Sequence, residues 1–434
     1  MFDSMKIRSR RNHCLDIFNA AVSAVLPANF LPAHLPAPPE MGRLFILAAG
    51  KAAGSMAAAA EAHYLDVLGF PSERMVGLAV ARHGYGVPMR VVEMIESGHP
   101  VPDEASVEGA RRMMALADLA GANDLVVFLL SGGASANLVA PAGNITLAEK
   151  QAFTKTLLRS GVPIDGMNAI RKHLSRIKGG RLARHVAPAR LVTLALSDVP
   201  NDDFSTIGSG PTIPDVTTLA DARGVIARYG IAVPPAITAA LDDPGNESVK
   251  PGDPAFDKAT AIIAARPADA FSMAVAAAEK LGYRVINLGS ELEGEARAIG
   301  AQHAAATLRT MEEGGKIALI SGGELTVTIK GDGIGGPNQE YALALAIGLN
   351  GANGIVACAA DTDGTDGGAG KPTDPAGAFV DPTTLKRATE HGLDPARFLE
   401  NNDSTRFFAA LDDLHQTGPT LTNANDLRVI LIGD

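Results

Sequence analysis

Several features that would assign the chain to a specialised class of protein are missing from its 434 residues. Its two cysteines, Cys14 and Cys358, cannot build a framework of disulfide bridges and match no metal-ligand spacing, which suits a reducing compartment. No apolar run reaches the roughly 18 residues of a transmembrane helix. Outside residues 8–11 there is no sustained Lys/Arg tract, and the net charge is −10, so nucleic acid is a poor candidate partner. We therefore expect a cytoplasmic protein with two buried thiols and no membrane partner.

The N-terminus resembles an export signal only in part. Residues 9–11 read Ser-Arg-Arg and precede an Ala/Val-rich stretch, as in twin-arginine signal peptides. However, Asp16 interrupts the apolar run, and Leu15, Phe18 and Val22 recur at helical spacing. This pattern predicts a first helix of the mature protein.

Apolar and small residues are abundant: the chain is 46% hydrophobic and 20% charged, with 46 glycines. This composition is typical of an ordinary α/β protein. Short apolar runs alternate with Ala-rich helical stretches, the pattern of β-α-β units in a parallel sheet that helices cover on both faces. The runs that we predict as strands of this sheet are residues 44–48, 75–80, 125–130 and 191–196.

The length exceeds that of a usual single domain, so we expect two. Residues 242–254 are rich in Pro, Gly and Asp and are a candidate boundary. The pattern predicts domains of residues 1–250 and 251–434, the second being smaller, with its α/β core at about residues 315–434. Beyond the candidate boundary, residues 259–264, 270–281 and 283–288 predict a β-α-β unit whose domain stays open. Further on, strands are predicted at 317–320, 325–329, 355–360 and 427–432, and a helix at 339–349.

Two apolar runs break at the same phrase, Ser-Gly-Gly, at residues 131–133 and 321–323. Small residues after a buried strand leave backbone N–H groups exposed and let an anion approach, so the pair of turns favours phosphate binding. Tight packing alone is the alternative reason for such glycines. The candidate residues are Ser131, Gly132, Gly133, Ser135 and Asn137 in the first turn, and Ser321, Gly322, Gly323 and the possible Mg²⁺ ligand Glu324 in the second.

A third apolar run breaks at Gly50 and Lys51, before a predicted helix. A lysine at a helix entrance adds its charge to the helix dipole and attracts an oxyanion. A Walker A loop needs Gly five residues before Gly50 and Ser or Thr after Lys51, but Phe45 and Ala52 stand there. The turn is therefore not a P-loop, and a solvated lysine is the alternative interpretation.

Residues 168–178 combine cationic side chains with Ile170, Leu174 and Ile177 at helical spacing. Arg171 on the edge of such a helix is suited to hold a carboxylate by two hydrogen bonds. A solvated helix face is the alternative.

Two acidic loops follow predicted strands. Asp198 comes directly after the strand at 191–196, where a carboxylate is a candidate Mg²⁺ ligand or base. Asp363 lies in the second loop, residues 361–368. Turns in which aspartate binds its own backbone are the alternative for both loops.

Residues 331–336 match the glycine fingerprint of dinucleotide-binding proteins, so a dehydrogenase is a rival interpretation. The preceding predicted strand alternates polar and apolar residues and ends in Lys330, unlike the buried first strand of a Rossmann unit. Pro337 is typical of a helix start. The match is therefore weak evidence on its own.

Taken in order, these stretches resemble the type-2 glycerate kinase family, whose C-terminal part is called the MOFRL domain. The resemblance covers nearly the whole chain and implies a large Rossmann-like parallel-sheet domain, a smaller α/β MOFRL domain and an active site in the cleft between them. The matching segments are residues 50–51, 131–133, 168–181, 196–212, 321–324, 335–340, 361–368 and 417–427.

The resemblance implies a kinase that transfers the γ-phosphoryl group of ATP to the 2-hydroxyl of D-glycerate, giving 2-phosphoglycerate, with ATP and Mg²⁺. Lys51 aligns with a lysine that is catalytic in that family. Some relatives carry a basic residue before Asn-Gln-Glu, whereas this chain has Pro337, so no cationic help is expected there. Family members are also labelled hydroxypyruvate reductases, which makes NAD(P)H-dependent reduction the alternative function.

The roles that we assign follow from this resemblance and the residue chemistry. Asp198 binds Mg²⁺ or accepts the hydroxyl proton, and Arg171 anchors the glycerate carboxylate. The partner is a small molecule, and a homo-oligomer stays open. The remaining assignments are Ser135 and Asn137 to substrate, Gly50, the two Ser-Gly-Gly turns, Asn338 and Asp363 to nucleotide phosphates, and Glu324 and Asp363, beside Asp198, to the metal.

Overall fold

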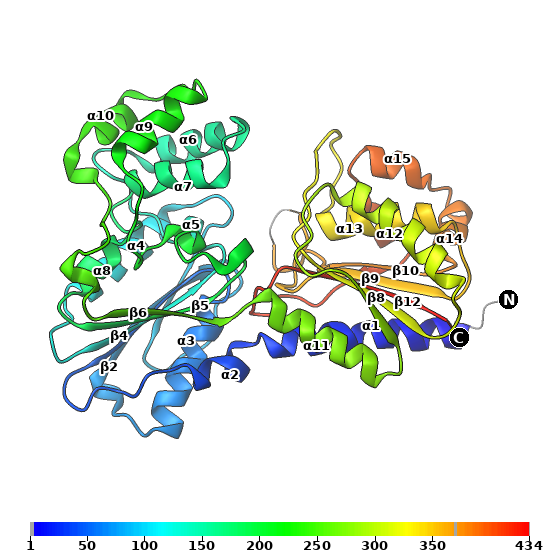
Figure 1. Ribbon diagram of the computed structural model, residues 1–434, viewed down its shortest axis with the longest axis horizontal. Helices are drawn as coiled ribbons and strands as arrows, with labels where there is room; N and C mark the ends of the chain where they lie inside the picture. Colours follow the sequence, from blue (N-terminus) through cyan, green and yellow to red (C-terminus); the bar gives the residue numbers. More distant parts are fainter. Residues whose placement is uncertain (1–3, 369–370, 434) are drawn as a thin grey trace. The chain divides into compact units, whose positions relative to one another are not determined.

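The computed structural model describes residues 4–368 and 371–433, and the chain divides into two compact units. The parallel-sheet unit is formed by Pro27–Ala265. The mixed-sheet unit joins Met1–Leu26 to Arg266–Asp434. Each unit has its own six-stranded sheet with helices on both faces (Figure 1). The predicted α/β class, with a parallel-sheet domain and a second α/β domain, is confirmed.

The first sheet has the strand order β3-β2-β1-β4-β5-β6, and all neighbouring strands are parallel. The order reverses at β1, because the chain returns after β3 to the other side of β1. In open parallel sheets such a reversal leaves a crevice at the carboxyl ends of the strands, where ligands bind. The strands are β1 (Leu44–Ala49), β2 (Met75–Arg82), β3 (Glu93–Ser97), β4 (Leu125–Ser131), β5 (Arg190–Leu196) and β6 (Ala259–Ala265).

The central strands β1 and β4 are buried along their whole length, as expected for strands that helices cover on both faces. On one face, Phe45, Leu47 and Phe128 pack in a core with Met113 of α4. Helix α3 covers the opposite face (Figure 1). The helices next to this sheet are α2 (Pro27–Phe30), α3 (Ala53–Ala62), α4 (Glu104–Ala117), α5 (Ala134–Asn137) and α8 (Arg181–Val186).

Four further helices form a cluster with its own apolar core, which includes Phe153, Ile170 and Ile237. They are inserted between β4 and β5 and between β5 and β6. The helix expected through Ile177 ends at His173, because the chain turns to form a bridge between Ser175 and Pro141. The members of this helix cluster are α6 (Leu147–Arg159), α7 (Ile164–His173), α9 (Leu219–Arg228) and α10 (Pro235–Asp242).

The second sheet has the order β11-β10-β9-β12-β8-β7, in which only β7 and β8 are parallel neighbours among the described strands. Its strands are β7 (Arg284–Gly289), β8 (Ile317–Gly323), β9 (Ile355–Asp361), β10 (Gly377–Val380), β11 (Leu414–His415) and β12 (Asp426–Ile432). Helices α1 (Ser4–Ala24) and α11 (Pro267–Lys280) lie on one face, and α12 (Ala296–Met311) and α13 (Pro337–Leu349) on the other (Figure 1). Three short helices follow: α14 (Thr384–Glu390), α15 (Pro395–Glu400) and α16 (Ser404–Ala410).

These units differ from the expected division at residue 250. The predicted first helix exists as α1, but it packs on α11, β9 and β12 of the mixed-sheet unit. Its Arg11 guanidinium lies 2.5 Å from a carboxylate oxygen of both Asp381 and Asp413. Residues 242–254 stay inside the parallel-sheet unit, and the chain leaves that unit only after β6. The β-α-β unit predicted at 259–288 is therefore shared between two sheets.

Three smaller expectations have clear outcomes. Cys14 and Cys358 are both buried and unbonded, as predicted. Residues 325–329 form no regular strand; Thr326 makes one isolated bridge to Glu295. In the described part of the chain no single helix is both long and apolar enough to cross a membrane, and only a bent pair, Ser4–Ala24 with Pro27–Ala33, meets that length and composition.

Candidate functional site

The carboxyl ends of β1 and β4 lie side by side where the strand order reverses, and their turns are hydrogen-bonded to each other. The N–H of Lys51 donates to the Gly132 carbonyl over 2.8 Å. The N–H of Ala52 donates to the Ser131 hydroxyl over 3.0 Å. Gly50 has a φ of +119°, and a Cβ there would lie 2.4 Å from the Ser131 carbonyl oxygen. Gly50 thus permits the turn after β1 to approach the turn after β4 closely. The binding of phosphate by these two turns stays a prediction.

The Lys51 side chain lies beside Gly133, at the same edge of the sheet as His99. Gly133 precedes α5 with a φ of +83°, and a Cβ there would lie 3.0 Å from Lys51 Cγ and 3.1 Å from the His99 ring. The fold therefore brings together a lysine and a glycine that the sequence places far apart. They meet at the reversal of strand order, where ligands of parallel sheets bind.

A pocket of about 180 Å³ opens at this edge. This volume is below the roughly 300–1,000 Å³ of pockets for drug-sized molecules, so the pocket suits a small ligand. Two residues that the sequence assigned to substrate, Arg171 and Ser135, both line it. The polar part of the lining is His99, Ser135, Lys150, Thr154, Arg171 and Lys178.

Three cations face this pocket without an acidic partner. Lys150 of α6 and Lys178 are only 7% and 3% exposed. Their Nζ atoms donate to main-chain carbonyls, of Leu174 over 3.3 Å and of Ser135 over 2.9 Å. Across residues 4–368 and 371–433, no carboxylate pairs with these lysines or with Arg171. Buried charges without a counter-ion are costly, so the arrangement favours an anionic ligand.

Burial lowers the pKa of all three cations, and neighbouring positive charges add to the effect for the two lysines. Burial, followed by the charge of Arg171, lowers the pKa of Lys150 to about 8. Burial and the neighbouring Lys150 and Arg171 lower the pKa of Lys178 well below its ordinary value. Burial also lowers the pKa of Arg171. An anion in the pocket would favour the charged form of each group.

A chain of polar side chains leads from the pocket wall into the helix cluster. The Ser135 and Ser209 hydroxyls are 2.9 Å apart, and Ser209 donates to Asn168 Oδ1 over 3.4 Å. Ser209 has a φ of +62° between two glycines that are also left-handed. Strained backbone of this kind clusters at functional sites. The sequence did not single out Ser209, although its Gly-Ser-Gly surroundings were a visible signal.

Asn137 does not line the pocket, contrary to its assignment as a substrate ligand. Its side chain is fully buried. The amide nitrogen donates to the Ser97 hydroxyl over 3.1 Å and to the Gly98 carbonyl over 3.2 Å. Asn137 therefore supports the loop that carries His99.

The sequence reasoning missed Lys150, Lys178 and His99. For Lys150 a signal existed, because it shares the buried stripe of α6 with Phe153 and Leu157. A lysine on an apolar helical stripe is unusual and calls for a partner. Lys178 belongs to the cationic segment 168–178 but received no role there, and no pattern marks His99; these two residues reach the pocket through the turns that follow α7 and β3.

The second Ser-Gly-Gly phrase has a different environment from the first. It lies inside β8, and Arg428 of β12 donates to the carbonyls of Gly322 over 2.9 Å and Gly323 over 3.0 Å. A Cβ at Gly323 would lie 2.1 Å from the backbone nitrogen of Leu292. Ser321 is buried as well. Packing against a neighbouring loop, the alternative that the sequence left open, thus accounts for these glycines, and phosphate binding at this turn stays a prediction.

Asn338 lies in an internal network rather than at a nucleotide site. Its side-chain nitrogen donates to Asp366 Oδ1 over 3.2 Å and to Asp426 Oδ1 over 2.6 Å. Asp366 also accepts the N–H groups of Asn338 and Gln339 at the start of α13. Burial, followed by the charge of Asp426, raises the pKa of Asp366 to about 7. All four side chains are buried, so contact between Asn338 and phosphate is not supported.

The predicted metal ligands belong to both units. Asp198 follows β5 in the parallel-sheet unit, whereas Glu324 is exposed and Asp363 is buried in the mixed-sheet unit. Asp363 accepts the N–H and hydroxyl of Thr365, the alternative that its loop left open. Within the described ranges no three His, Cys, Asp or Glu side chains gather as a metal cage. Mg²⁺ needs only one or two carboxylates beside phosphate oxygens, so Asp198, at the carboxyl end of a strand next to β4, fits an ion that arrives with a nucleotide.

The glycines of residues 331–336 have a packing role. No regular strand precedes them. A Cβ at Gly331 would lie 2.3 Å from Asn401 Oδ1, and one at Gly333 would lie 2.5 Å from the Asn401 carbonyl and from Asp403 Cβ. The segment is therefore no strand-turn-helix of the Rossmann type, and the dinucleotide fingerprint is a chance match.

Comparison with known proteins gives matches over both units. A family model described as a domain of unknown function, DUF4147, matches residues 13–242, and the MOFRL family matches residues 317–426. The D-glycerate 2-kinase of Thermotoga maritima is 37% identical over 438 residues, which cover 100% of both chains. An Agrobacterium vitis protein named "Putative hydroxypyruvate reductase" is 46% identical over 423 residues, 96% of this chain and 93% of the relative.

A solved structure extends this comparison. The crystal structure of a glycerate kinase from Thermotoga maritima superposes with a TM-score of 0.83 at 37% identity. The match covers 98% of this chain and 100% of that one.

Proposed function

This chain belongs to the glycerate kinase family that combines a DUF4147 domain with a MOFRL domain, and from that premise we propose that it phosphorylates the 2-hydroxyl of D-glycerate with ATP. The observation that carries the proposal is the small pocket beside Lys51, which the buried Lys150 and Lys178 and the half-buried Arg171 face without an acidic partner among the described residues. A three-carbon acid matches both its size and its charge.

The carboxylate of D-glycerate is bound by the pocket cations. Arg171 is suited to two parallel hydrogen bonds with a carboxylate, because its guanidinium is planar. Lys150 and Lys178 add positive charge from the helix cluster and from the turn after α7. The Ser135 hydroxyl, held by Ser209, offers a hydrogen bond to a substrate hydroxyl.

Phosphoryl transfer takes place at the edge where Lys51 and Gly133 meet. Such transfer depends on positioning and on neutralising the charge of the transferred group, and Lys51 supplies a positive charge there. Asp198, after β5, would hold Mg²⁺ or accept the proton of the substrate hydroxyl. Mg²⁺ bound with ATP would neutralise phosphate charge.

NAD(P)H-dependent reduction of hydroxypyruvate is the second candidate function, since the Agrobacterium vitis relative carries that name. The residues of this chain give it little support. The one dinucleotide-like motif packs against Asn401 and Asp403, and no strand leads into it.

One pair of assays separates the two functions. The protein is incubated with D-glycerate and MgATP while ADP is followed, and in parallel with hydroxypyruvate and NADH or NADPH while coenzyme oxidation is followed. We expect ADP and 2-phosphoglycerate to form in equal amounts. Coenzyme oxidation without ADP formation would contradict the proposal and favour the reductase.

A further inference from the structure

We propose that two anchors at the end of α7 position the pocket cations for the acid, and we call them the α7 clamp: Lys172 with Asp215, and His173 with Glu247. These four are positioning residues, since they act through Arg171, Lys178 and Lys150. The inference rests on the proposed function, because it concerns binding of the same acid.

The first anchor is a buried ion pair. Lys172 Nζ lies 3.2 Å from Asp215 Oδ1, and the two side chains are only 6% and 1% exposed. Asp215 is held in turn by the N–H of Thr217 over 3.1 Å and by its hydroxyl over 2.9 Å. On the other side, the Lys172 carbonyl accepts from Arg181 over 2.8 Å. The last turn of α7 is thus fixed through both side chain and backbone.

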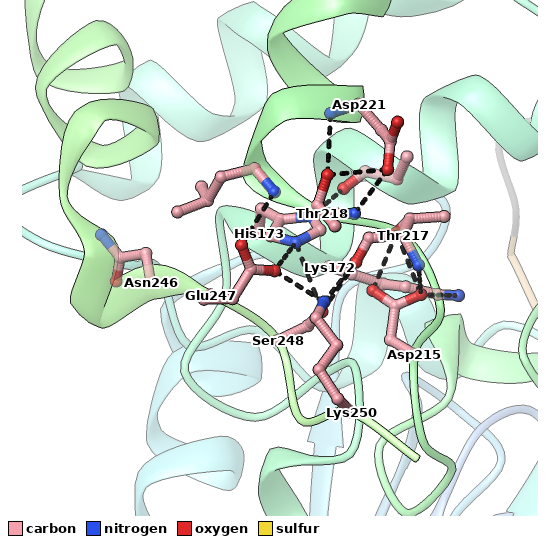
Figure 2. Close-up of polar contacts among 12 residues, drawn as sticks. Lys172, His173, Asp215, Thr217, Thr218, Asp221, Asn246, Glu247, Ser248 and Lys250 are labelled. Atoms are coloured by element: carbon pink, nitrogen blue, oxygen red, sulfur yellow. Dashed lines mark hydrogen bonds and ion pairs between the residues drawn. The ribbon is translucent and has the colours of Figure 1, made fainter.

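The second anchor holds the final residue of α7. His173 is fully buried; its Nδ1 lies 2.7 Å from the Ala169 carbonyl oxygen, and its Nε2 lies 2.9 Å from Glu247 Oε1. Lys250 Nζ lies 2.6 Å from the same Glu247 oxygen. The other oxygen accepts the N–H of Leu219 at the start of α9 over 3.1 Å. Figure 2 shows His173, Glu247 and Lys250 converging, with Lys172 and Asp215 next to them.

Glu247 stays ionised in this setting. Burial acts to raise its pKa, but the hydrogen bonds from Lys250, the Leu219 N–H and His173 outweigh it and lower the pKa to about 2. Lys250 also donates to the Ser248 hydroxyl over 2.6 Å and to the Thr217 carbonyl. The two anchors are therefore joined through Thr217, which binds Asp215 as well.

The clamp lies at the centre of the segment that supplies the pocket charges. Arg171 directly precedes the clamped residues, and Lys178 follows them in the next turn. The Leu174 carbonyl, next to His173, holds Lys150. Since these cations repel one another, their convergence before substrate arrives requires an anchor elsewhere, and the contacts of Lys172 and His173 provide it.

The test uses the full-length protein with Glu247→Ala, which removes the contacts to His173, Lys250 and Leu219. Glu247→Gln is the conservative variant, because an amide oxygen can still accept. Asp253→Ala is the matched control. Like Glu247, Asp253 pairs with a basic side chain, that of Arg184, and accepts a backbone N–H, that of Ala255, but it does not contact α7. The kinetic measurements are kcat, KM for D-glycerate and KM for ATP. The thermal measurements are the melting temperature and the amount by which D-glycerate or inorganic phosphate raises it.

We expect Glu247→Ala to raise KM for D-glycerate about tenfold, while kcat and KM for ATP change less than about twofold. Glu247→Gln should restore most of the affinity for D-glycerate. Asp253→Ala should leave KM for D-glycerate unchanged. A lower melting temperature with an unchanged KM would assign a merely structural role and overturn the inference. An equal rise of both KM values would do so too.

The wild-type measurements distinguish this inference from the proposed function. The clamp alone is refuted if the wild type forms ADP, or is stabilised by D-glycerate or inorganic phosphate, and Glu247→Ala binds the same anion equally well. A wild type without kinase activity whose anion-induced stabilisation is lost in Glu247→Ala refutes the kinase and leaves the clamp supported. Absence of both activity and stabilisation overturns both.

Discussion

Lys150 occupies a position on the buried stripe of α6 that Phe153 and Leu157 continue one and two turns later. Its Nζ donates to the Leu174 main-chain carbonyl, and no acid neutralises it within the described residues. The site therefore keeps a charge where an apolar residue would be more stable. Such conflicts between stability and local chemistry are typical of functional positions.

The first prediction concerns Lys150→Met. Because the pKa falls from an ordinary 10.5 to about 8, the charged form costs the folded state roughly 3 kcal/mol at pH 7, and the lost hydrogen bond offsets about 1. We expect the free energy of unfolding to rise by roughly 2 kcal/mol, measured by urea unfolding, while KM for D-glycerate rises. Lys155→Met, exposed on the same helix, is the control and changes neither.

The same substitution tests the pH dependence. As pH rises through about 8, wild-type Lys150 loses its charge and the pocket loses attraction for the carboxylate, so kcat/KM for D-glycerate falls. Lys150→Met lacks this descending limb. An identical limb in both proteins would assign the decline to another group.

The second prediction concerns Lys51→Met. Losing one cation at the transferred phosphoryl group costs several kcal/mol, so kcat falls on the order of 10³-fold. KM for D-glycerate changes little, because the carboxylate is bound by other cations. Lys155→Met again serves as the control. Near-normal turnover of Lys51→Met would refute its catalytic role.

At the scale of elements, the turns after β1, β3 and β4 meet at one edge of the sheet. Gly133 is a position where all three turns meet: it has a φ of +83°, and Lys51 and His99 fill the space beside its Cα. A side chain there meets backbone strain and two functional residues together. The glycine is thus needed for the site as well as for the turn.

The third prediction compares Gly133→Ala with Gly230→Ala. Both positions are left-handed, with φ of +83° and +59°, but nothing lies within 4 Å of a Cβ at Gly230. Each variant loses about 1 kcal/mol of stability from backbone strain. Only Gly133→Ala displaces Lys51 and His99, so we expect kcat/KM to fall at least tenfold in that variant and to stay within about twofold in the other. Equal activities would show that the close approach has no functional role.

At the scale of the whole molecule, the mixed-sheet unit is completed by the first residues of the chain. Cys14, Ile17 and Phe18 of α1 are fully buried or nearly so. Arg11 and Arg387 together neutralise Asp381 and Asp413, whose side chains are 3% and 1% exposed. The mixed-sheet unit therefore combines α1 with a segment that follows the whole parallel-sheet unit in the sequence.

The fourth prediction concerns Arg11→Met. Two buried carboxylates would keep only Arg387, which costs roughly 2 kcal/mol, less than the loss of a whole buried pair. Urea unfolding and hydrogen exchange of β9, β10 and β12 report the loss. Arg8→Met, exposed on the same helix, has no such effect. The KM for D-glycerate stays unchanged in both variants, because the pocket belongs to the parallel-sheet unit.

The sequence by itself determined most strands of both sheets, although not β3, β10 or β11, together with the Gly50-Lys51 and Ser131-Gly132-Gly133 turns and the family. These features are local: buried strands, turn glycines and charged helix edges depend on residues close together in the chain. Only the tertiary structure decided that α1 belongs with the mixed sheet, that Gly322, Gly323 and residues 331–336 serve packing, and that Lys150, Arg171 and Lys178 face one pocket. Each of these depends on contacts between distant segments, which burial and charge establish together and which no local pattern encodes.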